Sequence, residues 1–360
     1  MNDIDQLFDK DAADDLVFSV GQLLDDGLLV TDPDAIVTSA NSAAVRFLGE
    51  GMVGKHLTDV FAKSDPDAEF NMAAAVEKES EFTFRPESAV PREFRVRLKK
   101  LVDDKIIVLL LDMTLQRNLE KVRRDFVANV SHELRSPLTS LAGFIETILS
   151  NDIKDPETIL RFFNIMDEEA KRMSRLIDDL LSLSRVEVDE HIIPTETVPL
   201  MEVVRMVIAS LENRAHQRGM TIAIDDKRPD KSTSTVMFGY ADEINEIFHN
   251  LVENAVKYGF ENTAITVEII FLDDTTIAIG ITNIGEPIAE KHISRLTERF
   301  YRVDKARSRQ IGGTGLGLAI VKHIVNRHRG SLTIGSTNKG ETSFTVQLPV
   351  FEQQQKQRKP

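Results

Sequence analysis

Two stretches near the middle of the chain carry apolar residues at helical spacing. Steps of three and four place the first set on one face of an α-helix: Leu119, Val122, Phe126, Val130, Leu134, Leu138, Leu141, Ile145 and Ile148. The same period recurs over 159–181. The pattern predicts two amphipathic helices, the first ending near Leu149, joined by a turn-rich link over 151–156. Because one hairpin cannot cover its own apolar seam, we expect it to form a four-helix bundle with a second copy.

Shorter predicted elements precede the hairpin, and a separate domain follows it. Before it, the pattern predicts strands over 27–31 and 35–39, a helix over 42–48 capped by Asn41 and stopped by Gly49, an alternating strand from Phe94, and a buried strand over 106–111. After it, residues 184–197 read as a linker, and a separate α/β domain begins near Val198.

The fold class that follows is multidomain α+β. Its expected parts are a flexible N-terminus at 1–15, a mixed α/β domain at 16–111, the helical hairpin at 112–188, a second α/β domain at 198–350 and a disordered tail at 351–360.

Composition narrows the function classes. The 360 residues have a net charge of −14, which argues against a general nucleic-acid binder. The chain has no cysteine, which excludes disulfides and thiolate chemistry and fits a reducing, cytoplasmic location. The longest apolar run near the front, 106–111, is far shorter than the ~20 residues of a membrane span. We therefore expect no direct span, and any attachment to a membrane would go through an upstream partner.

On the first predicted helix, His132 lies in a polar strip opposite the apolar face. Glu133 follows it, and Pro137 is expected to bend the helix one turn later. A lone helical histidine is most often a solvated surface residue. A zinc protease is excluded because its second histidine would fall at Ser136.

The run 124–135 resembles the phospho-acceptor box of sensor histidine kinases, and is especially similar to the phosphate-regulon sensor kinases. The resemblance implies that His132 takes a phosphoryl group from ATP on one ring nitrogen, while Glu133 holds the other nitrogen and accepts its proton. It also implies a homodimer that passes the group to an aspartate on a response-regulator receiver domain. Relatives often carry Thr or Asn where Ser136 stands, for phosphatase action on the partner, and its hydroxyl lies on the His132 face.

The strand order before the hairpin resembles a PAS sensor domain, and the alternative is a small domain that only helps dimerisation. The join at 112–124 has no Pro or Gly. An unbroken helix there would suit the transmission of rotation or register shifts between domains, or would act as a coiled-coil spacer.

In the last domain, a helix predicted over 242–258 presents Asn250, Asn254 and Lys257 on one face. Such a face is usually just solvated, but amide oxygens suit Mg²⁺ and a lysine suits phosphate. The run 250–258, which ends at Tyr258, is similar to the N box of histidine kinases. That resemblance puts Mg²⁺ on Asn250.

A glycine cluster directly precedes a predicted helix. Exposed backbone amides at a helix start form an anion site; the alternative is that the cluster is only a flexible hinge of a lid. Beside the N box, it looks like the second glycine box of the GHKL-type ATPases. This resemblance implies a C-terminal α/β sandwich that binds ATP with Mg²⁺, and Arg302, in an F-box-like run, as a phosphate contact. The nucleotide residues of the cluster are Gly313, Thr314, Gly315, Leu316 and Gly317.

The first glycine box departs from the family pattern Asp-x-Gly-x-Gly. Asn283, Gly285 and Pro287 occupy its three fixed positions. The family's Asp accepts a hydrogen bond from the adenine amino group, and a neutral amide accepts more weakly by roughly 1 kcal/mol. We therefore expect ATP binding to be weakened about tenfold, with Pro287 stiffening the loop.

The sequence thus predicts a dimeric sensor histidine kinase, and its local similarity points to phosphate-starvation signalling. Two alternatives stay open. Asn283 and Pro287 also fit a pseudokinase that acts as a dimeric phosphotransfer or regulator-binding scaffold. A GHKL ATPase that hydrolyses ATP for mechanical work would need no phospho-acceptor.

Overall fold

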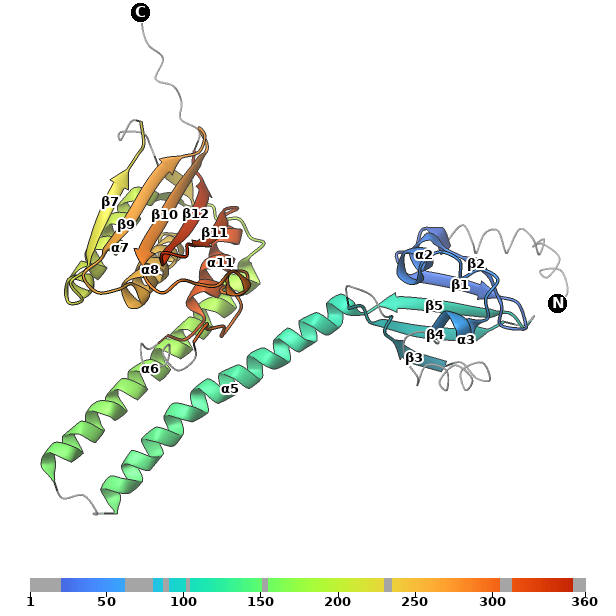
Figure 1. The fold of residues 1–360 in the computed structure, drawn as a ribbon, viewed down its shortest axis with the longest axis horizontal. Helices are drawn as coiled ribbons and strands as arrows, with labels where there is room; N and C mark the ends of the chain where they lie inside the picture. Colours follow the sequence, from blue (N-terminus) through green and yellow to red (C-terminus); the bar gives the residue numbers. More distant parts are fainter. Residues whose placement is uncertain are drawn as a thin grey trace, which may run out of the picture. The chain divides into compact units, whose positions relative to one another are not determined.

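The computed structural model describes residues 21–61, 80–86, 91–101, 104–150, 155–229, 235–304 and 313–351. The predicted N-terminus at 1–15 and nearly all of the predicted link and tail lie outside these residues. The chain divides into two compact units, Met1–Ala128 and Asn129–Pro360 (Figure 1). Within the described ranges, no helix is both long enough and apolar enough to cross a bilayer.

The first unit is built on an antiparallel sheet whose five described strands follow the order β2-β1-β5-β4-β3. Its elements are β1 (Gly27–Thr31), β2 (Val37–Ala40), α2 (Ser42–Leu48), α3 (Leu57–Phe61), β3 (Ser80–Phe84), β4 (Phe94–Lys100) and β5 (Ile106–Asp112). Alternate strand residues, such as Leu29, Phe94 and Val108, are fully buried and form the core together with Phe61. In β4 this alternation is the signal from which the sequence predicted the strand, whereas β5 was predicted as a buried apolar run.

The turn after β1 is longer than the sequence suggested. Asp32 Oδ1 accepts hydrogen bonds from the amides of Asp34 (3.0 Å) and Ile36 (2.8 Å), and Ala35 has a φ of 60°. The second strand therefore begins at Val37 instead of Ala35. The sequence also missed α3 and β3, because each has only five residues and carries little periodicity.

The helical part of the chain consists of α5 (Thr114–Leu149) and α6 (Pro156–Asp189). The first helix ends where predicted. The second begins with Asp155 as N-cap, whose carboxylate accepts from the amides of Glu157 and Thr158. The linker predicted from Ser184 was wrong at its start, because α6 continues to Asp189 and buries Leu183 and Val186. Between the two helices, the rings of Phe144 and Phe162 lie 4.8 Å apart.

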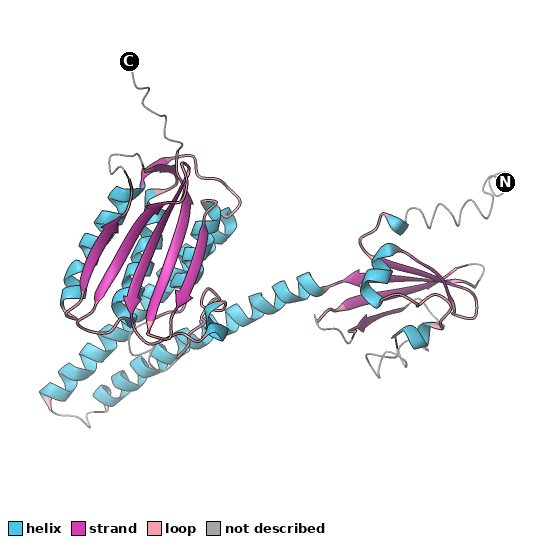
Figure 2. Cartoon of the chain, turned by 45° about the horizontal axis from the view of Figure 1, so that its top comes forward, coloured by secondary structure: helices cyan, strands magenta, loops and turns pink. Residues whose placement is uncertain are grey.

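The rest of the second unit is a two-layer α/β sandwich. Its described sheet has the order β11-β12-β10-β9-β7, and Figure 2 shows helices covering one of its faces. The elements are β6 (Thr197–Pro199), α7 (Leu200–His216), β7 (Thr221–Asp226), β8 (Val236–Phe238), α8 (Ala241–Tyr258), β9 (Ala264–Phe271), β10 (Thr276–Ile284), α9 (Glu290–Ile293), α11 (Gly317–Arg327), β11 (Ser331–Ser336) and β12 (Glu341–Pro349). Only β7 and β9 pair in parallel among the strand pairs described. We call this sandwich the ATP lobe below, after the resemblance of its sequence motifs to those of the GHKL-type ATPases.

The core of the ATP lobe lies between its sheet and its helices. On β9, the fully buried positions are Ile265, Val267 and Ile269. They alternate with more exposed residues, as a sheet with one buried face requires. On the helix side, Phe248 and Leu251 of α8 are almost completely buried. The helix α8 ends before Gly259, as predicted, and carries its polar face away from this core.

In the first unit, one buried polar side chain connects three chain segments. Asn41 is 2% exposed. Its Oδ1 accepts from the amides of Leu28 (2.9 Å) and Ala44 (2.8 Å), and its Nδ2 donates to the carbonyls of Gly21 (2.7 Å) and Asp26 (2.8 Å). The helix cap predicted at this residue is therefore also a link between α2 and the start of β1.

We predict that Asn41→Ala lowers the free energy of unfolding of the first unit by about 2–4 kcal/mol, because it removes a helix cap and leaves buried backbone groups unpaired. Differential scanning calorimetry on the full chain measures this. The control is Ser42→Ala, at an exposed neighbour that bonds only Gln22 in the contacts described. Equal losses for both variants would contradict the role given to Asn41.

Candidate functional site

His132 is exposed on α5. It borders a cavity of about 550 Å³ together with Asn129, Ser136 and Thr139 of the same helix. Phe300 and Arg302, from the segment that follows α9, also line this cavity. The fold thus brings part of the ATP lobe next to the predicted phospho-acceptor and its polar strip.

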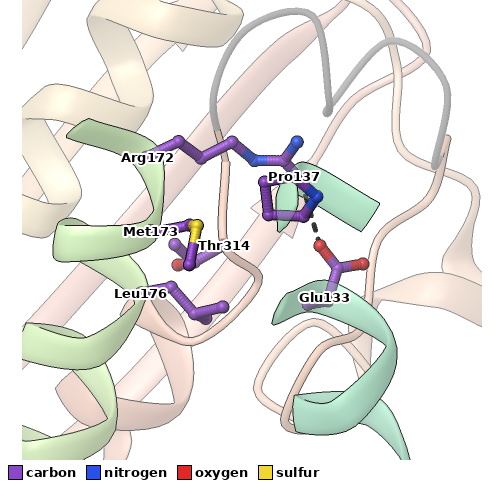
Figure 3. A pocket seen from close by; sticks show the side chains of 6 residues that line it. All are labelled: Glu133, Pro137, Arg172, Met173, Leu176 and Thr314. Atoms are coloured by element: carbon purple, nitrogen blue, oxygen red, sulfur yellow. Dashed lines mark hydrogen bonds and ion pairs between the residues drawn. The ribbon is translucent and has the colours of Figure 1, made fainter. Parts of the chain in front are cut away.

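Glu133 points toward α6, where Arg172 binds it. Arg172 Nη2 lies 3.0 Å from Glu133 Oε2, and the two side chains are 16% and 19% exposed. Arg302 Nη2 lies 3.4 Å from the same oxygen. Figure 3 shows the Glu133–Arg172 pair beside Pro137, with Met173, Leu176 and Thr314 completing a small pocket. Glu133 Oε2 therefore accepts hydrogen bonds from two guanidinium groups.

Arg302 is the most deeply buried of these charged groups, at 5% exposed. Burial lowers its pKa below the ordinary value, Glu133 opposes that shift, and the nearby Arg172 adds to it. Its Nη2 donates to the carbonyl of Thr314 at 2.7 Å, whereas its Nε has no hydrogen-bond partner among the described residues. A buried N–H donor without a partner is suited to an anionic ligand.

The glycine segment before α11 packs closely against this arginine. Gly315 has a φ of +77°, and a Cβ there would lie 3.0 Å from the Phe300 backbone and 3.2 Å from Arg302 Nε. Thr314 Oγ1 donates to Asp179 Oδ2 on α6 at 2.6 Å. Burial raises the pKa of Asp179, and the Thr314 hydroxyl acts in the opposite direction. Two predicted nucleotide contacts, Arg302 and Thr314, thus bind carboxylates of the hairpin in this conformation.

The amide of Asn250 has a defined orientation. Its Nδ2 donates to the carbonyl of Glu246 at 2.9 Å, so Oδ1 is the atom that faces the start of α11. A Cβ at Gly317 would lie only 2.4 Å from that oxygen. An oxygen beside a helix N-terminus is a suitable donor for Mg²⁺ held jointly with phosphates, so the residues present fit this ion.

Other members of the predicted N-box face are engaged differently. Asn254 is half-buried, and Lys257 Nζ bonds Glu253 Oε2 at 2.8 Å, one turn earlier on α8. Tyr258 is 37% exposed at the end of the helix. The structure therefore pairs Lys257 with a carboxylate, and its predicted contact to phosphate stays a prediction.

The predicted adenine residues lie at the end of β10. Asn283 is 4% exposed, and Gly285 forms a β-bridge with Gly259, the residue after α8. The Gly285 amide donates to the carbonyl of Gly340 at 2.7 Å. Pro287 is exposed, outside this tightly packed corner. The corner brings Asn283 and Gly285 to the end of α8.

Three polar residues at these places were missed by sequence reasoning. Arg172 and Asp179 looked like surface positions of an amphipathic helix, because their partners lie 39 and 135 residues away in the chain. Arg218 donates to the carbonyls of Lys257 (3.0 Å) and Gly259 (3.2 Å) and so caps the end of α8. No local pattern marks any of the three.

Two parts of the chain match family models. Residues 122–188 match the "His Kinase A (phospho-acceptor) domain". Residues 239–352 match the "Histidine kinase-, DNA gyrase B-, and HSP90-like ATPase" family. The second match implies that the ATP lobe uses ATP.

Relatives extend the similarity over most of the chain. It is 33% identical over 337 residues to the sensor protein kinase WalK of Staphylococcus aureus, covering 91% of this chain and 79% of that protein. A WalK from Staphylococcus aureus strain JH9 is equally similar, but the chain spans only 54% of its length. These relatives do not carry the phosphate-regulon name that the local pattern suggested.

Among solved structures, histidine kinase ThkA, crystallised in complex with response regulator protein TrrA, has a TM-score of 0.50 at 21% identity. The match covers 91% of this chain and 96% of that one, and it shows a shared fold. The two family matches and the WalK relatives lead to one conclusion: the chain belongs to the sensor histidine kinases of two-component systems.

Proposed function

We propose that this chain transfers the γ-phosphoryl group of ATP to a ring nitrogen of His132 and then passes it to an aspartate of a response-regulator receiver domain. The observation that carries the proposal is the cavity of about 550 Å³ that His132 shares with Phe300 and Arg302. An exposed imidazole there faces a part of the lobe that belongs to an ATPase family.

The reaction divides among the residues present. The unprotonated imidazole nitrogen of His132 attacks the γ-phosphorus, and the bond to the bridging oxygen of ADP breaks. Glu133 orients the ring and accepts the proton from its other nitrogen. Arg302, whose Nε has no hydrogen-bond partner among the described residues, donates to phosphate, and the amides at the start of α11 bind the anion. Mg²⁺ held on Asn250 Oδ1 would neutralise phosphate charge.

In the conformation described, Arg302 binds Glu133 and Thr314 binds Asp179. Phosphate binding therefore requires both lobe residues to exchange a carboxylate partner for the nucleotide. Hydrogen bonds of this kind contribute little net free energy each, since either partner can replace the other. The exchange gives ATP a direct way to release the lobe from the hairpin.

Further parts of the proposal concern assembly and sensing. Apolar side chains on both hairpin helices are exposed in the single chain, as a homodimer would require: Leu119, Val122, Leu138, Ile145, Leu160, Phe163, Ile177 and Leu181. The sheet order of the first unit supports a PAS-like sensor domain at 16–111, with the hairpin at 112–188 and the ATP lobe at 198–350. Ser136, on the cavity wall, would position water for phosphatase action. Phosphate sensing and a cytoplasmic location stay predictions of the sequence.

A second candidate function follows from the adenine corner. Asn283 is neutral and buried where the family pattern has a charged acceptor. A lobe that bound ATP too weakly would leave the protein a dimeric scaffold that passes on phosphoryl groups or binds a regulator. The labelling experiment described next distinguishes three functions: the histidine kinase, this scaffold, and an ATPase that works without His132.

With γ-labelled ATP and Mg²⁺, we expect the purified chain to acquire acid-labile label, and His132→Gln to reduce it to background, because the acceptor nitrogen is removed. The control is His216→Gln, which changes an exposed histidine of α7 and should retain full label. Absence of label on the unchanged chain favours the scaffold. Steady phosphate release that His132→Gln does not diminish favours the ATPase.

We predict that Asn283→Asp tightens binding of a non-hydrolysable ATP analogue by about tenfold at pH 8, because a carboxylate accepts the adenine amino group more strongly than an amide does. Isothermal titration calorimetry on the full chain measures the change. Asn213→Asp adds the same charge at an exposed position on α7 and should leave affinity unchanged. Unaltered or weaker binding by Asn283→Asp would refute this account of the adenine corner.

A further inference from the structure

We propose that Arg172 is a positioning residue for the phosphorylation of His132: it binds one oxygen of Glu133 and so restricts the carboxylate that serves as base in that reaction. The inference rests on the proposed function, because it assigns a task to the base of that reaction. In the contacts described, its ion pairs are to Glu133 and Glu169, and we assign it an action through Glu133 alone.

The geometry supports a fixed orientation. Arg172 Nη2 lies 3.0 Å from Glu133 Oε2. Figure 3 shows the guanidinium and Pro137 lining one pocket, with the second carboxylate oxygen of Glu133 directed away from the guanidinium. Both side chains are less than one-fifth exposed, so solvent screens the pair weakly. A carboxylate held through one oxygen loses rotational freedom about its terminal bond, which is the freedom that a general base must lose to accept a proton.

Arg172 is itself held in place. Its Nη1 lies 3.7 Å from Glu169 Oε2, one turn earlier on α6. Met173 and Leu176 line the small pocket beside the pair, together with Pro137. These apolar side chains border the pocket that the guanidinium also lines. The position of Glu133 on α5 therefore depends on Arg172 and on where α6 holds it.

Arg302 contacts the same oxygen, but it cannot do the same task during the reaction. It belongs to the ATP lobe, also binds the Thr314 carbonyl, and is proposed to donate to phosphate. Arg172 belongs to the hairpin that carries His132 and stays there when the lobe moves. Glu133 thus keeps one guanidinium partner when Arg302 turns to the nucleotide, and the carboxylate is never left buried and unpaired.

The competing interpretation is an ion pair that only stabilises the hairpin. Kinetics of His132 labelling on the full chain at saturating and limiting ATP can distinguish the two. We expect Arg172→Gln to lower the maximal labelling rate about tenfold, part of the roughly 10²–10⁴-fold contribution typical of a positioned base. The ATP concentration at half-maximal rate should change less than about twofold, since Arg172 does not bind nucleotide.

Two further variants test whether Arg172 acts through Glu133. Arg172→Lys keeps a donor that can reach one carboxylate oxygen, and should restore the rate to within about threefold of the unchanged chain. In a Glu133→Gln background, labelled over hours, Arg172→Gln should slow labelling less than about twofold, because the group it positions is already gone. Arg175→Gln, at an exposed arginine on the same helix, is the control and should match the unchanged chain.

The inference is overturned if Arg172→Gln labels as fast as the unchanged chain, if it slows the Glu133→Gln protein as much as it slows the original, or if Arg175→Gln has the same effect. A lowered melting temperature with a normal rate below that temperature would assign Arg172 a structural role only. If the unchanged chain takes no label on His132, the proposed function itself fails, and that result is separate from all of these.

Discussion

The arrangement of the second unit depends on one largely buried carboxylate. Glu133 is the residue after His132, and its Oε2 is bound by Arg172 from the hairpin and by Arg302 from the ATP lobe. A charged group with so little access to water has to be paired, and removing a partner is costly. The pairing therefore fixes the rotation of α5 about its axis at Glu133 and His132. Glu133 is turned toward α6, and His132 borders the cavity.

Several contacts between hairpin and lobe are polar and replaceable, beside the apolar residues Leu183 and Val186 that α6 buries. Ser182 donates to both oxygens of Glu246, at 2.7 and 2.8 Å, and His323 Nδ1 bonds Glu190 at 2.7 Å. Burial raises the pKa of Glu246, against the hydroxyl of Ser182. Hydrogen bonds of this kind are worth little net free energy each because water or a ligand can replace them. Polar contacts of this kind hold one conformation without making another inaccessible, as the proposed transfer from ATP to His132 would require.

Asn283 shows a conflict between folding and binding. Its side chain is buried on a strand that also contributes to the core of the lobe. Burying a neutral amide is much less costly than burying a carboxylate that has no partner. The amide therefore suits the lobe without nucleotide, whereas a carboxylate would suit the lobe with adenine bound. We expect the departure from the family pattern to affect affinity; it does not remove the architecture, since Gly285 still pairs with Gly259 and Gly340.

The sequence by itself determined the periodic elements and the local chemistry. These features depend on residues that lie close together in the chain, so their spacing in the sequence is informative. They are the two hairpin helices, the ends of α5 and α8, and the motifs around His132, Asn250 and Gly315. Only the tertiary structure decided which side chains meet. Arg172 reaches Glu133 across 39 residues, and Arg302 reaches it across 169. Such pairs leave no periodic trace, because a charged residue on a helix reads as solvated until a distant segment folds against it.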